Sequence, residues 1–279
     1  MAISMARVEA KVTFLPAHRA ISRGGNATKP DIIMTARSRG FALHHRWDGV
    51  AFPAFVLLIW TVIVMGFVPE VVDQVRTNSF QYPFLTHVHA VVFIGWLVLL
   101  TVQTALIRGH NLRLHRRLGV AAAVMVPMVV LLGLAASISM SHRLYAPDFP
   151  PLTLSMRIAD MLGFGVAAGA GLALRKNPAA HKRLMLLATF CLTAAGFGRW
   201  WGDWMRGHFG TGFFGRWSFD YPGVLLLILL LAGYDFVTRR STNRPYTVAA
   251  VAVVSIQLVG VLVRDLPGWE PVAMVLIGR

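Results

Sequence analysis

The sequence predicts an all-α integral membrane protein, a bundle of about seven transmembrane helices. Of its 279 residues, 56% are hydrophobic, and the mean hydropathy is +0.60. Charged residues make up 14% of the chain, against roughly 25% in soluble domains. Apolar stretches of about 20 residues recur, which is the length needed to cross a bilayer. So few charges cannot cover a globule, so much of the surface must face lipid.

Seven apolar stretches follow one another along the chain. The fourth is the least apolar because it contains Arg157 and Asp160. None shows the ten-residue alternation of a transmembrane β-barrel. The stretches cover residues 51–70, 84–107, 118–140, 155–174, 183–202, 219–238 and 246–264.

Lysine and arginine alternate between the two sides of these stretches. Nineteen lie in residues 1–50 and in the loops after the second, fourth and sixth stretches, seven lie on the other side, and Arg157 lies within a span. Because cytoplasmic loops are enriched in these residues, the pattern predicts a cytoplasmic N-terminus and an outside C-terminus.

Residues 1–50 form a separate region that precedes the transmembrane domain, 51–279. They are basic and lack the apolar core of a signal peptide, which predicts a flexible cytoplasmic tail. An organellar transit peptide and a true start at Met34 remain alternatives. The net charge of +15 does not predict nucleic-acid binding, since the basic residues lie between apolar runs and in this tail.

A weak repeat organises the middle of the chain. Leu114–Leu118 reads LHRRL and opens the third stretch, and residues 180–184 read AHKRL and open the fifth. The second and third helices, and the fourth and fifth, are therefore expected to form two similar hairpins and a four-helix core within 84–202. Gly165-x-x-x-Gly169 in the fourth helix is a motif for close helix packing in lipid.

The second stretch carries a polar stripe of three ligand-binding candidates: His89, Trp96 and Gln103. At about 100° per residue, Trp96 lies about 20° and Gln103 about 40° from His89, so the three share one face over about 21 Å. Polar groups in hydrocarbon normally face protein or a cavity. The stripe is therefore expected to face the bundle interior.

Four charged residues at the outer end are the other ligand-binding candidates. Arg157 and Asp160 are three residues apart, and Arg199 and Asp203 are four apart, so each pair is able to neutralise itself on its own helix. The alternative interpretation joins all four with His89 in one outward-facing polar pocket.

The inner end carries two basic motifs, which have three interpretations. They hold the helices in a positive-inside orientation and contact headgroups, they bind an anionic ligand, or they form a haem or quinone site. Asp235, near Arg239, is expected to be a satisfied pair at this end. The residues of the motifs are His115, Arg116, Arg117, His181, Lys182 and Arg183.

Haem b is the one metal cofactor that the histidines suggest. Bis-histidine ligation needs two imidazoles from different helices at one depth, and the candidate pairs are His89 with His142 outside and His115 with His181 inside. Gln103 stands where a two-haem cytochrome repeats its histidine, which argues against haem. The single Cys191 excludes an internal disulfide and a multi-cysteine metal site. No Walker loop, HExxH motif or nucleophile elbow is present.

These motifs resemble those of a group of uncharacterised bacterial multi-pass membrane proteins, of the domain-of-unknown-function type. The resemblance covers about residues 50–200 and rests on His89 with Gln103, LHRRLG at 114–119, HKRLMLLAT at 181–189 and Arg199. It implies a bacterial inner-membrane location and no particular activity. A more distant likeness to cytochrome b561-type four-helix cores rests on the hairpins and histidines alone.

Two functions are therefore expected as alternatives. The first is a membrane protein that binds a small or lipidic ligand, or that serves as a subunit of a membrane complex. The second is a membrane redox protein that handles haem b or quinone. Membrane lipids are the expected partners in either case, and whether the chain is an enzyme stays open.

Overall fold

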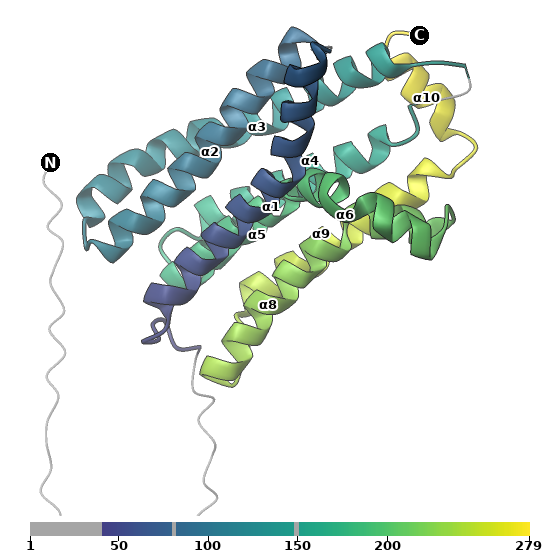
Figure 1. The fold of residues 1–279 in the computed structure, drawn as a ribbon. Helices are drawn as coiled ribbons and strands as arrows, with labels where there is room; N and C mark the ends of the chain where they lie inside the picture. Colours follow the sequence, from purple (N-terminus) through teal and green to yellow (C-terminus); the bar gives the residue numbers. More distant parts are fainter. Residues whose placement is uncertain (1–40, 80–81, 148–150) are drawn as a thin grey trace, which may run out of the picture. The chain divides into compact units, whose positions relative to one another are not determined.

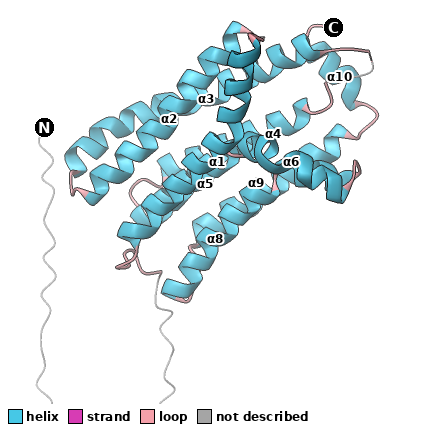
Figure 2. Ribbon diagram, viewed as in Figure 1, coloured by secondary structure: helices cyan, strands magenta, loops and turns pink. Residues whose placement is uncertain are grey.

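The protein is an all-α membrane bundle, as the sequence predicts. The computed structural model describes residues 41–79, 82–147 and 151–279, so most of the predicted tail lies outside the described residues. The described parts form helices and no β-strand (Figures 1 and 2). Their bounds are α1 Asp48–Thr77, α2 Phe84–Arg108, α3 Leu112–Leu144, α4 Leu154–Ala173, α5 Pro178–Leu192, α6 Ala194–Phe209, α7 Phe213–Asp220, α8 Pro222–Arg239, α9 Arg244–Arg264 and α10 Trp269–Leu276.

Six of these helices are long and apolar enough to cross a membrane, namely α1, α2, α3, α4, α8 and α9. The remaining predicted span, 183–202, which is the fifth along the chain, is not one straight helix. It corresponds to α5 and α6, which meet at Thr193 with a bend of 48°. The Thr193 hydroxyl donates to the carbonyl of Phe190 at 2.6 Å, and such back-bonding bends helices. Counted as one broken span, the pair brings the total to the predicted seven.

The bundle has two ends that differ in chemistry. The basic end is where α2, α4 and α8 finish and where α1, α3, α5 and α9 begin, and its loops include residues 109–111, 174–177 and 240–243. The opposite end carries the short helices α7 and α10. The residues predicted to be inner lie at the basic end, and those predicted to be outer lie at the opposite end.

An asparagine caps each of three helices that start at the basic end. The Oδ1 atoms of Asn111, Asn177 and Asn243 accept from backbone amides three residues later, at 3.1–3.2 Å. Such caps satisfy amides that have no partner inside the helix. Because Asn111 and Asn177 stand four residues before His115 and His181, the caps place both histidines at the same position in the first turn.

The predicted hairpins form, because α2 packs against α3 and α4 against α5. The centre of the bundle, however, lies towards α4 and α5, and α9 packs along α4 almost as extensively as the hairpin partners do. Half of the α4 span is buried, against 11% of the α2 span. The second helix is thus peripheral, which the repeat did not indicate.

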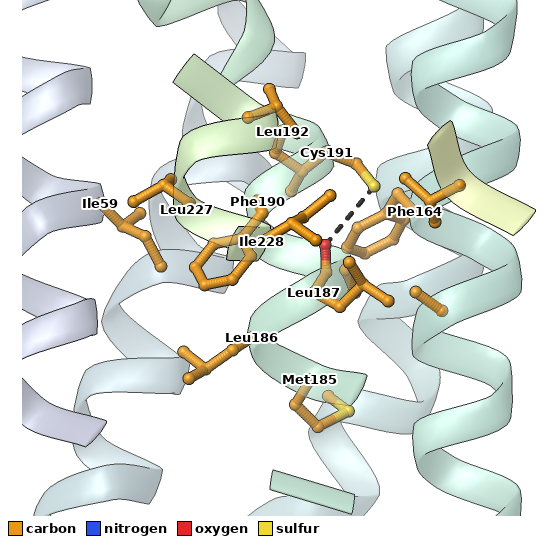
Figure 3. Close-up of a cluster of buried hydrophobic side chains, with 14 of the residues drawn as sticks. Ile59, Phe164, Met185, Leu186, Leu187, Phe190, Cys191, Leu192, Leu227 and Ile228 are labelled. Carbon is orange, nitrogen blue, oxygen red and sulfur yellow. Dashed lines mark hydrogen bonds between the residues drawn. The ribbon is translucent and has the colours of Figure 1, made fainter. Parts of the chain in front are cut away.

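The apolar core surrounds α5. Figure 3 shows Phe190 and Leu187 of α5 between Ile59 of α1, Phe164 of α4 and Leu227 of α8. Cys191 is a buried free thiol that donates to the carbonyl of Leu187 at 3.4 Å, so it is part of the packing, consistent with its place in an apolar run.

One close helix crossing fixes the position of α1 against α6. A Cβ added to Gly66 would lie 2.4 Å from the carbonyl oxygen of Gly196. Only a glycine permits this approach of two backbones. The crossing brings the second half of α1 beside the first turns of α6, where Arg199 lies.

Candidate functional site

The outer candidate residues do not form one pocket. Arg157 Nη1 lies 3.2 Å from Asp160 Oδ2, as its spacing on the helix predicts, but its Nη2 is closer to Asp220 Oδ2, at 2.5 Å. Asp220 ends α7 and was not expected to take part. The result is a cluster of Arg157, Asp160 and Asp220, which we call the outer triad.

The predicted pair of Arg199 and Asp203 is not formed. Arg199 Nε donates to Glu70 Oε2 of α1 at 2.6 Å, and Glu70 also accepts from the hydroxyl of Tyr82. The Asp203 side chain is 95% exposed and reaches only Arg206, at 4.0 Å. The close crossing of α1 and α6 explains the difference, because it offers Arg199 a carboxylate from another helix.

His89 and Trp96 belong to the packing of α2. The His89 ring lies 5.8 Å from the ring of Phe93. Trp96 is buried, and its Nε1 donates to the hydroxyl of Thr189 in α5 at 3.1 Å. Trp96 therefore ties α2 to α5, and the third member of the stripe, Gln103, lies at the basic end.

Unlike the inner pair, His89 and His142 make no ring contact with each other in the part of the chain that the structure describes. His142 Nδ1 lies 2.7 Å from the carbonyl oxygen of Ile277, just after α10. This bond fastens the end of α3 to the C-terminal region. His142 thus has a structural partner of its own.

The inner histidines do meet. The rings of His115 in α3 and His181 in α5 lie 6.4 Å apart between centroids and are nearly perpendicular, at 82°. His181 Nδ1 is 2.7 Å from the carbonyl oxygen of Gly171 in α4, a bond that leaves Nε2 available. Both rings are half-buried. The shared capping register of α3 and α5 is what sets them at one depth.

Gln103 lies beside this pair. Its backbone faces the His115 imidazole, and its side-chain amide is 4.0 Å from the position of a Cβ on Gly119, one turn beyond His115. In the part of the chain that the structure describes, neither Gln103 Oε1 nor His115 Nδ1 has a hydrogen-bond partner, although both atoms are buried. We call His115, His181 and Gln103 the histidine site.

The basic residues that follow the two histidines have different environments. Arg116 and Arg117 are exposed beside the histidine site. Lys182 Nζ is bound to Asp48 Oδ2 of α1 at 2.7 Å. Arg183 is fully buried, so the expectation that it belongs to a headgroup-contacting face is wrong.

Arg183 is instead held by α8. Its Nε and Nη2 donate to both oxygens of Asp235 at 2.6 and 2.5 Å, and its Nη1 donates to the carbonyl of Ala179 at 2.7 Å. Arg239 also approaches Asp235, at 3.6 Å, as its spacing predicts, and bonds Asp48 more closely, at 2.7 Å. These ion pairs link α1, α5 and α8.

A shallow apolar groove of about 440 Å³ opens at the basic end along α4, α5 and α9. Its walls include Ala170, Leu184 and Val248, and Arg244 at the start of α9 lines its edge. The groove has the composition of a surface for hydrocarbon chains with one cation beside it.

The histidine site does not amount to a complete protein-made metal site. Over the described ranges, no group of three or more His, Cys, Asp or Glu side chains is placed to hold a metal ion. Two imidazoles alone fit haem, whose porphyrin supplies the other ligands, or an organic ligand that exchanges hydrogen bonds with them.

Sequence reasoning missed Asp48, Glu70 and Asp220. Each stands near the end of an apolar stretch, where a charged residue is expected to contact headgroups. Their ion-pair partners lie 63 to 191 residues away along the chain, as with Asp220 and Arg157 or Asp48 and Arg239. In the sequence, the one feature that marks these three residues is that they are acidic in a chain with many more basic residues.

Comparison with protein-family models, with curated proteins and with solved structures gives no match for this chain. The site must therefore be interpreted from its own geometry.

Proposed function

We propose that this protein is a multi-pass protein of a bacterial inner membrane that binds a lipidic ligand with an anionic headgroup at its basic end. The basic loops support a cytoplasmic position for that end, because positive residues are retained on the cytoplasmic side. Under this orientation the N-terminus is cytoplasmic and the outer triad faces the other side.

The observation that carries the proposal is the histidine site. Two imidazoles and an amide from three helices converge, and two of their buried polar atoms have no partner among the residues described. Buried polar groups are normally hydrogen-bonded, so a ligand that supplies the missing bonds would be stabilised there. Arg116 and Arg117, exposed on the next positions of α3, favour a headgroup of negative charge.

The test measures lipid dependence of stability. We expect the full chain to unfold at a higher temperature in vesicles or mixed micelles containing phosphatidylglycerol than in those containing phosphatidylcholine only, since binding to the folded state stabilises it. The variant with His115→Gln and His181→Gln should lose this difference, and the control His44→Gln, an exposed histidine at the same end, should keep it. An equal difference in the double variant and in the wild type would refute the proposal.

A second candidate function is that of a haem b protein, because the proximity of the inner pair favours it. The rings of His115 and His181 come from two different helices and lie 6.4 Å apart between centroids, so these two imidazoles would hold the group. The bond from His181 Nδ1 to Gly171 is the type of contact that orients a metal-binding histidine.

Haem would supply one-electron chemistry, and His115 and His181 would hold it. An absorption spectrum of the protein purified from haem-replete cells tests this candidate directly. A Soret band that disappears in both His115→Ala and His181→Ala supports it, and a spectrum without the band rejects it while leaving lipid binding to be judged by the vesicle experiment.

A further inference from the structure

The outer triad lies at the end of the bundle away from the histidine site, and its charges do not balance. It joins one guanidinium, that of Arg157, to the carboxyl groups of Asp160 and Asp220, whose side chains are each 5% exposed. With both carboxyl groups ionised, the triad carries one negative charge. Burying an uncompensated charge in apolar surroundings costs far more than burying a neutral group.

The neighbouring cations do not supply the missing charge. Arg199 is bound to Glu70, as described above. Arg206 lies over the ring of Phe219, 4.4 Å from its centroid, and 53% of its side chain is exposed. Both affect Asp220 only at longer range. A further positive charge is therefore needed within the triad itself.

One atom of the triad is available to receive that charge. Asp160 Oδ1 is buried and has no hydrogen-bond partner in the described part of the molecule. The other oxygen of Asp160 faces Arg157 at 3.2 Å, a longer contact than the 2.5 Å between Arg157 and Asp220. The guanidinium thus favours the ionised form of Asp220 more than that of Asp160.

The other groups around Asp160 are neutral. They are the buried hydroxyl of Tyr221, the thiol of Cys191 on α5 and the amide of Gln257 on α9. The Tyr221 hydroxyl lies within hydrogen-bond reach of the Asp160 carboxyl group and 3.4 Å from the Met156 carbonyl. Gln257 Nε2 is buried without a partner among the described residues. Gln257 lies between Val253, which faces Gly163, and Gly260, which touches Ala159, so it is at the level of Asp160 on the helix that packs along α4.

We propose that Asp160 is a proton-binding site. One proton is held on its carboxyl group and is exchanged with the nearby surface, at the end of the bundle where the outer triad lies. The proton makes the triad neutral as a whole, and it turns the unpartnered oxygen into a hydrogen-bond donor. Arg157, with a side chain 27% exposed, connects the triad to that surface.

The environment of Asp220 also disfavours the ionisation of both carboxyl groups of the triad. Burial raises the pKa of Asp220 above its ordinary value even though Arg157 opposes this effect. Two carboxyl groups that share a site titrate as a pair, with one of them protonated over a wide range of pH.

The experiment compares Asp160→Asn with Asp220→Asn in the full-length protein in detergent or nanodiscs. Asparagine resembles a protonated aspartate, so Asp160→Asn should keep its unfolding temperature within about 2 °C of the wild type near pH 6. Asp220→Asn removes the closer ionic partner of the partly buried Arg157 and should lower that temperature by roughly 6 °C or more. Infrared spectroscopy should detect a protonated carboxyl group in the wild type that is absent from Asp160→Asn and present in Asp203→Asn, the exposed control.

The pH dependence has a definite sign. A carboxyl group that is protonated in the folded protein and ionised in the unfolded chain favours folding at low pH, so the stability that it contributes is lost as pH rises. As the pH is raised from mildly acidic to alkaline, the wild type should therefore lose more stability than Asp160→Asn does.

Three results would overturn the proposal. They are a carboxyl band that persists in Asp160→Asn, a larger loss of stability in Asp160→Asn than in Asp220→Asn, and a stabilisation of the wild type by sodium chloride over choline chloride that Asp160→Asn abolishes. The last would assign the position to a metal cation instead of a proton.

Discussion

Two arginines that form ion pairs, one near each end of the bundle, meet different surroundings. Arg183 at the basic end is fully buried, and all its nitrogens donate to Asp235 or to the Ala179 carbonyl. Arg157 at the opposite end faces two carboxyl groups, one oxygen of which has no partner among the described residues. The first arrangement is closed and structural, whereas the second leaves room for a proton. Both residues are arginines, and they differ in whether the hydrogen-bonding atoms of their carboxylate partners are all satisfied.

The difference shows that a charge inside a membrane bundle is not by itself a sign of function. A buried pair with every bond made contributes to specific packing, and a mismatch between donors and acceptors points to a ligand. By this criterion the histidine site and the outer triad are places to examine, and the ion pairs of Arg183 are not.

The largest loss of stability is expected when Arg183 loses its carboxylate partner, Asp235. Asp235→Asn leaves the Arg183 guanidinium buried without a counter-charge and should cost about 3–5 kcal/mol, measured by reversible unfolding in mixed micelles. The double variant Arg183→Met with Asp235→Leu should recover much of this loss, because an apolar pair of similar size avoids the desolvation of both charges. A double variant no more stable than Asp235→Asn would show that the pair does more than neutralise itself.

A smaller effect is expected at the edge of the same network. Asp48 accepts from Lys182 at 2.7 Å, from Tyr234 at 2.6 Å and from Arg239 at 2.7 Å. Its side chain is 14% exposed, so water partly replaces the lost contacts in Asp48→Asn. We expect a loss of about 1–3 kcal/mol in the same unfolding assay. A loss as large as that of Asp235→Asn would mean that Asp48, and not Asp235, holds the basic end together.

The pair of Arg199 and Glu70 should contribute less again. The two side chains are 39% and 37% exposed, and pairs of this exposure contribute about 0–1 kcal/mol. Glu70→Gln should therefore change stability by less than about 1 kcal/mol, and the effect should shrink as salt is added. A salt-independent loss would place this pair with the buried ones.

The smallest effect is expected at Asp203. Because its side chain is 95% exposed, Asp203→Asn should leave the unfolding curve unchanged. A double-mutant cycle should find coupling between Arg199 and Glu70 and none between Arg199 and Asp203. Measured coupling between Arg199 and Asp203 would instead support the pair that their spacing in the sequence predicts.

Some features of the candidate sites followed from the sequence because they depend on local spacing. The Arg157–Asp160 contact is an i, i+3 pair, and the depth shared by His115 and His181 follows from two similar helix starts. Spacing also suggested Arg199 with Asp203 and a close contact at Gly165-x-x-x-Gly169. In the structure a Cβ on Gly169 would meet nothing within 4 Å, and it is Gly171 that faces Met185 of α5. A spacing on one helix shows which residues share a face but not which face is covered.

The sequence by itself determined that the chain is an all-α membrane bundle with about seven spans, because length and hydropathy of a helix are local properties that a bilayer selects directly. It also determined which residues are the scarce polar ones. The tertiary structure alone decided which of them are satisfied: the bend at Thr193, the crossing of α1 with α6 and the packing of α9 on α4 choose the partner of each charge. Those choices depend on contacts between distant segments, where one hydrogen bond made or missing separates a structural pair from a site.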